Sequence, residues 1–208
     1  FCPQCGKHGS EWDAGGMKVI ERQGEIEKRL HGRKRVVLIK SPHFYLFTDI
    51  RSMKIRTRDG GPRIIGMHEI AHLYIQRCEI AYMDFVKHFG SRVNLGTPMA
   101  VYLVDDDRTM RDIQAAYFGS PRTNIIYGGG SKRIAGGYPG NGFATSLQKG
   151  RDDYGLHLQV RHSVGHILMS CWIIVNGQEK YLPKWMYCGA GHWLSRYHPR
   201  LAEMATFC

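Results

Sequence analysis

Two histidine pairs with the same spacing are the residues of this chain best suited to bind a metal ion. His68 and His72 form an HExxH motif, in which Glu69 follows the first histidine. Two histidines one helical turn apart hold one Zn²⁺, and the glutamate takes a proton from the zinc-bound water that attacks a peptide carbonyl. Taken alone, the motif predicts a zinc metallopeptidase that uses His68, Glu69 and His72.

The surroundings of this first pair favour another interpretation. A helix is predicted from about residue 64 to residue 89, and its apolar stripe includes Ile70 and Phe85. His68 and His72 lie on the opposite face of that helix, and no third ligand follows them at a suitable spacing. We therefore interpret the HExxH match as a polar helix face, and we keep the active zinc peptidase as an alternative function.

The second pair, His162 and His166, lies on a strongly apolar stretch that is predicted to be a helix from residue 156 to about residue 175. The residue that follows the first histidine is Ser163 rather than a glutamate. A hydroxyl group of very high pKa is not a general base at neutral pH. This pair therefore has the spacing of a metal site without the base that peptide hydrolysis requires.

The stretch from 160 to 193 resembles the core of the gluzincin, or peptidase MA-like, domains of bacteria. The residues that match the RHExxH block of that family, or its LPxWLxEGLAxY block, are Arg161, His162, His166, Leu182, Pro183, Trp185 and Gly189. Upstream, an HFxxxTD stretch, a long helix and a PxxVYL stretch follow in the family's order. The resemblance covers roughly residues 36 to 208 and implies a zincin-like α+β domain, with long helices packed on a mixed sheet.

Two departures from the family pattern determine what the resemblance implies about activity. The family's general-base glutamate falls on Ser163, and its third metal ligand falls on Cys188. A set of His162, His166 and Cys188 suits Zn²⁺ or copper. The alternative is a buried histidine pair without a metal, beside a free thiol or a disulfide for which Cys171 is an available partner. In either case the resemblance implies a metallopeptidase-like domain that has lost its catalysis.

Outside the histidine pairs, the amino-terminal segment carries two further candidates. Cys2 and Cys5 form a CPxCG knuckle, which is either half of a metal site, a local disulfide or two free thiols. The densest basic run is Arg33, Lys34 and Arg35, in a chain of net charge +11. This run makes a polyanion-binding module the second alternative, although no motif of a nucleic-acid-binding fold accompanies it, and we expect no specific nucleic-acid partner.

The elements that would position these residues divide the chain into a connector, residues 1–35, and a domain, residues 36–208. Strands and helices are mixed without a strict alternation, which indicates an α+β class. The further predicted elements are strands at 36–39, 43–47, 99–104 and 124–127, helices at 110–118 and from residue 184 or 185, and a glycine-rich surface loop at 128–142.

Length and composition set the remaining expectations. The 208 residues suit one ordinary domain, and the longest apolar run, about 167–175, is too short to span a bilayer. Because the chain begins with Phe1 and stops at Cys208, directly after a helical stretch, we expect a processed product or a piece of a longer protein. The resulting hypothesis is a non-catalytic scaffold or binding subunit. Its expected partners are other protein subunits of a larger assembly, which is exported to the periplasm, the cell surface or the extracellular space.

Overall fold

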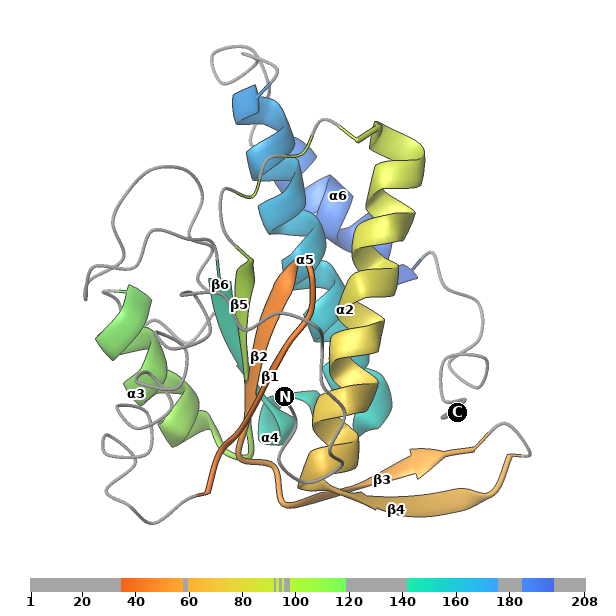
Figure 1. Cartoon of the computed structure of the whole chain (residues 1–208), viewed down its shortest axis with the longest axis vertical. Coiled ribbons are helices and arrows are strands. Elements are labelled where there is room, and N and C mark those ends of the chain that lie inside the picture. Colours follow the sequence, from red (N-terminus) through yellow and green to blue (C-terminus); the bar gives the residue numbers. More distant parts are fainter. Residues whose placement is uncertain are drawn as a thin grey trace.

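The computed structural model describes residues 35–57, 60–91, 93, 95, 98–118, 142–175 and 185–196. Within these ranges the chain combines a mixed four-stranded sheet, a separate two-stranded hairpin and long helices (Figure 1). This arrangement confirms the α+β class that the sequence predicts.

Four strands form the main sheet: β1 (Val37–Lys40), β2 (Phe44–Thr48), β5 (Met99–Val104) and β6 (Gly142–Ser146), in the order β1-β2-β5-β6. β1 runs antiparallel to β2, whereas β2, β5 and β6 are parallel to one another. Parallel strands are usually covered on both faces, so they carry continuous apolar runs, and β2 and β6 are buried along their whole length. The predicted strands correspond to β1, β2 and β5, whereas β6 was not predicted.

Helices cover both faces of this sheet (Figure 1). On one face, Phe44 packs in a core shared with α2 (Met67–Phe89) and α5 (Asp153–Val175). On the other face, Phe47 packs in a smaller core with α3 (Asp107–Phe118). Successive side chains of a strand point to opposite faces, which is why β2 supplies both cores. The predicted helices at 110–118 and 156–175 are confirmed, and each begins three residues earlier than expected.

The start of the first long helix differs from the prediction. Residues 64–66 belong to strand β4 (Pro62–Gly66), which pairs with β3 (Ser52–Arg56) in an antiparallel hairpin. The helix begins at Met67, after Gly66 in an extended conformation at its N-cap. Ile64 is β-branched and pairs across the hairpin with Lys54, so residues 64–66 form part of a strand and not the start of the predicted helix.

A buried polar cluster fixes α2 against the first turn of α5. Arg77 donates from Nη1 to Oδ1 of Asp153 at 2.5 Å and from Nη2 to Oδ2 at 3.1 Å. The Tyr74 hydroxyl donates to the same Oδ1 at 2.8 Å, and burial raises the pKa of Tyr74 well above its ordinary value. Removing one partner of a buried ion pair costs about 3–5 kcal/mol, so this cluster holds the two long helices in register.

Two shorter helices complete the described part of the chain. α4 (Leu147–Gly150) is a single turn before α5, and α6 (Trp185–Arg196) begins where a helix was predicted from residue 184 or 185. Among the residues that the structure describes, no helix is both long enough and apolar enough to cross a membrane.

Several sequence predictions fall outside the described residues. They are the predicted strand at 124–127, most of the glycine-rich loop, the Cys2 and Cys5 knuckle, and the first two members of the basic run, Arg33 and Lys34. Arg35, the third member of that run, is exposed.

Candidate functional site

The second histidine pair lies at the contact between α5 and α6. The rings of His162 and His166 have centroids 4.6 Å apart and are tilted by 55°. α6 adds a third imidazole, because the ring of His192 lies 4.6 Å from that of His162. His166 is buried, at 7% exposure, His162 is half-buried and His192 is exposed. Three imidazoles from two helices therefore form a cluster at the edge of the core.

Two glycines allow α6 to approach α5 this closely. A Cβ atom on Gly165 of α5 would lie 2.9 Å from the Ala190 carbonyl oxygen and 3.0 Å from the Gly191 Cα atom. A Cβ atom on Gly191 would lie 2.4 Å from Cδ2 of His166. Because the obstructing atoms at Gly165 are backbone, no side-chain movement relieves that contact. The backbone of α6 consequently rests directly on the His166 ring.

Arg161, which precedes the pair on α5, connects this helix to α6 and to α2. Its Nε donates to the Leu194 carbonyl oxygen at 2.8 Å, and its Nη2 donates to Oδ2 of Asp84 on α2 at 2.8 Å. The Arg161 side chain is fully buried, and burial lowers the pKa of its guanidinium. One side chain thus joins α2, α5 and α6 around the histidine cluster.

The two imidazoles of α5, those of His162 and His166, both have lowered pKa values. Burial, together with the charges of His162 and His192, lowers the pKa of His166 to about 4. Burial and the charge of His192 also lower the pKa of His162, although its hydrogen bond to the Gly191 backbone acts in the opposite direction. At neutral pH these two rings therefore carry no charge.

Ser163 occupies the position at which an HExxH motif has its general base. The side chain is fully buried, and its Oγ donates to the Gln159 carbonyl oxygen at 2.8 Å. A helix carbonyl one turn back is an ordinary partner for a helical serine. The hydroxyl is therefore directed into the α5 backbone rather than toward a water on the histidines.

Cys188 lies on the exposed surface of α6, one turn before His192, and it is not joined to Cys171 by a disulfide. From α6, Gly191 lies against the His166 ring, and the ring of His192 lies beside that of His162. Among the described residues, no three His, Cys, Asp or Glu side chains are grouped so that they can hold a metal ion. We therefore derive no chemical step through a metal at this site. The ligand set with Cys188 stays a prediction.

The first histidine pair has a different role for its glutamate. Glu69 accepts a hydrogen bond from the Gly66 backbone N–H at 3.0 Å through Oε2, while Arg63 donates to Oε1. This is the reciprocal half of a capping box, which satisfies a backbone donor at the start of α2. The rings of His68 and His72 lie 4.6 Å apart, and both are half-buried. Both oxygens of the would-be catalytic base are thus occupied by the helix terminus and its neighbour.

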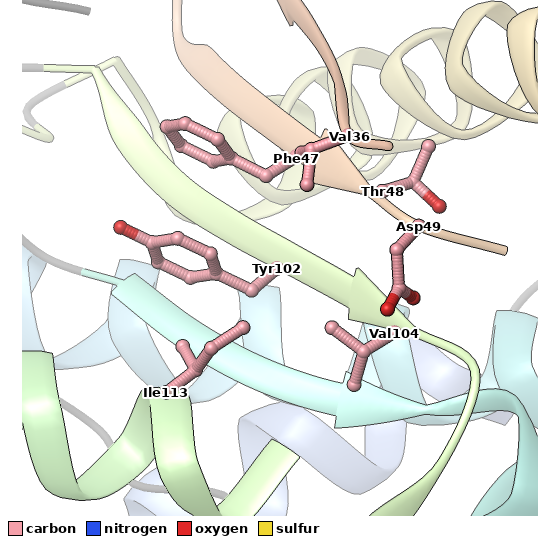
Figure 2. Close-up of a pocket in the computed structure, with 7 residues that line it drawn as sticks. All are labelled: Val36, Phe47, Thr48, Asp49, Tyr102, Val104 and Ile113. Carbon is pink, nitrogen blue, oxygen red and sulfur yellow. The ribbon is translucent and has the colours of Figure 1, made fainter. Parts of the chain in front are cut away.

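A small cavity lies on the α3 face of the main sheet, between β2, β5 and α3 (Figure 2). Its lining is mostly apolar, from residues such as Phe47, Tyr102 and Ile113, and Asp49 lies at one end. The Oδ1 atom of Asp49 accepts a hydrogen bond from the Asp105 backbone at 2.8 Å. The volume of about 10 Å³ has room for a single water molecule. This cavity is a packing gap and not a substrate site.

The sequence prediction missed two residues of the cluster. His192 follows Cys188 by four residues, which is the same spacing as His162 and His166, and this repeated spacing was the signal that could have identified it. The close approach at Gly191 had no such signal, because a glycine in a helix does not reveal which neighbour it contacts.

Comparison with protein-family models, with curated proteins and with solved structures finds no match for this chain.

Proposed function

We propose that this chain is a zincin-like domain without peptidase activity, which works as a scaffold or binding subunit of a larger, exported assembly. The resemblance of 160–193 to the gluzincin core supports the family assignment. The order of a strand, a long helix, a strand and the second histidine helix supports it as well, since β2, α2, β5 and α5 follow in that order.

The observation that carries the proposal is the environment of Ser163. A zincin needs a carboxylate that can reach the metal-bound water, and here a buried hydroxyl donates into its own helix. The other carboxylate with HExxH spacing, Glu69, already accepts two hydrogen bonds at the start of α2. Neither pair therefore has a carboxylate available as a general base. This favours a binding role over the alternative of an active peptidase.

The metal content of the domain is part of the proposal. We propose that a bound Zn²⁺ would use His162, His166 and Cys188, as the family pattern implies, and that its role would be structural because no base accompanies it. Elemental analysis of the purified chain tests this set. Zinc lost in His162→Ala and retained in His68→Ala supports it, whereas the reverse pattern transfers the metal to the first pair.

The decisive experiment measures cleavage of unfolded casein by the purified chain with added zinc, with and without a chelator. Removal of a general base slows such reactions by about 10²–10⁴, so we expect no chelator-sensitive cleavage. A double variant, Ser163→Glu with Cys188→Glu, restores both carboxylates of the family pattern and is the matched comparison. Chelator-sensitive cleavage by the unmodified chain, abolished by Glu69→Gln, would overturn the proposal in favour of His68, Glu69 and His72.

A further inference from the structure

The hairpin of β3 and β4 extends below α2 and away from the main sheet (Figure 1). Its inner face packs into the core through Met53, Ile55 and Ile65, all of which are buried. Its outer face carries the exposed side chains of Lys54 and Arg56. One face of this hairpin therefore anchors it, and the other is open to solvent.

The open face combines positive charge with an exposed apolar side chain. Lys54 lies directly opposite Ile64 in the register, and directly opposite residues share a face. Ile64 is 74% exposed, the largest exposed fraction among the large hydrophobic residues that the structure describes. An isoleucine held between cations in water is a small apolar patch whose burial would be favourable.

The cations of this face are not neutralised within the described part of the chain. Lys54 and Arg56 form no ion pair with any described residue. Arg63 lies opposite Ile55, on the other face, and pairs with Glu69. Residues 51–66 contain five Arg or Lys and a single Asp, so the hairpin segment is strongly positive. Its charge complements an anionic surface.

We propose that the outer face of this hairpin, formed by Lys54, Arg56 and Ile64, docks onto an anionic lipid surface. A lipid surface satisfies both features at once, because headgroup charges lie beside acyl chains into which an aliphatic side chain inserts. A single-stranded nucleic acid would instead stack on aromatic side chains, and residues 51–66 contain none. The inference is independent of the proposed function, since it does not depend on the histidine pairs.

The test is co-sedimentation of the full chain with two kinds of vesicle, one of phosphatidylcholine alone and one of equal parts phosphatidylcholine and phosphatidylglycerol. We expect binding to the anionic vesicles only, and weakening as salt rises, because salt screens exposed charges. Lys54→Glu with Arg56→Glu should weaken binding about a hundredfold, and Ile64→Ser about tenfold.

The matched control reverses two exposed charges elsewhere, Lys87→Glu on α2 and Arg111→Glu on α3, and changes the net charge equally. This control should keep most of the affinity, and circular dichroism should show that every variant is folded. Equal losses in the control and the hairpin variant would overturn the proposal, because net charge alone would then explain binding. Binding of heparin or DNA in preference to the vesicles, unaffected by Ile64→Ser, would also overturn it and indicate a general polyanion surface.

Discussion

The two histidine pairs share their spacing and a ring separation of 4.6 Å, but they lie in opposite surroundings. His68 and His72 are in the first turns of α2, next to an exposed ion pair between Arg63 and Glu69. The second pair lies beneath α6, where Arg161 is fully buried. The pair that keeps the complete HExxH pattern is thus at a helix end, whereas the pair that lost its glutamate is at the edge of the core.

This difference shows what a short motif can and cannot specify. The HExxH spacing places two imidazoles on one helix face wherever it occurs. Whether the intervening glutamate is a base or a cap depends on what lies near it, and at Glu69 the neighbours are a helix N-terminus and Arg63. Chemistry at such a motif requires a cleft and a third ligand, neither of which the motif contains.

The largest effect on stability that we predict is the loss of Arg161, compared with the loss of Arg63 near the first pair. Arg161→Ala should lower the free energy of unfolding by about 3–5 kcal/mol, because it leaves Asp84 with its buried partner removed. Arg63→Ala breaks an exposed pair and should cost about 0–1 kcal/mol. Urea denaturation of both variants measures the difference. Similar losses in the two variants would show that the second pair is not the more tightly held one.

An intermediate effect concerns pH. The pKa of His166 is about 4 in the folded chain, whereas an unfolded histidine has a pKa of about 6.5. Between these two pH values the histidine is protonated in the unfolded chain and neutral in the folded chain. Lowering the pH through this range therefore favours the unfolded chain. The free energy of unfolding is highest above about pH 6.5 and falls as the pH approaches 4. The loss amounts to about 3 kcal/mol.

Denaturation of the unmodified chain and of His166→Gln across this pH range tests the prediction. The stability difference between the two should shrink by about 3 kcal/mol from pH 6.5 to 4, because other titrating groups contribute to both. A difference that stays constant over this range would mean that the ring is not held neutral by the α5 and α6 contact.

The smallest effect concerns Glu69. Glu69→Ala removes the carboxylate that accepts the Gly66 N–H and should destabilise the chain by about 1 kcal/mol. Glu69→Gln keeps an acceptor oxygen and should cost less than Glu69→Ala. Thermal denaturation of the two variants measures this order. A catalytic base would respond differently, since both substitutions would remove its activity and neither would need to change stability.

Most of the regular elements could be predicted from local patterns. The continuous apolar runs of β2 and β5 and the helices α2, α5 and α6 follow from local patterns of apolar residues, which are a property of the sequence itself. The hairpin was missed although its signal was present. Polar and apolar residues alternate from Ser52 to Arg56, as in a half-buried strand. The start of the predicted helix was placed at residue 64, so part of the second strand, β4, was assigned to that helix. β6 is short and follows a glycine-rich stretch, so the local sequence pattern gave little indication of a strand there.

By itself, the sequence determined the α+β class, the two histidine pairs and the absence of a glutamate after His162, because these depend on residue type and on spacing within one element. The tertiary structure decided which groups meet. The approach of α6 at Gly165 and Gly191, and the contact of His192 with His162, join residues from separate helices. Such contacts depend on the packing of backbone against backbone, to which no periodicity along the chain corresponds. The same packing buries His166, and burial is the largest cause of its lowered pKa.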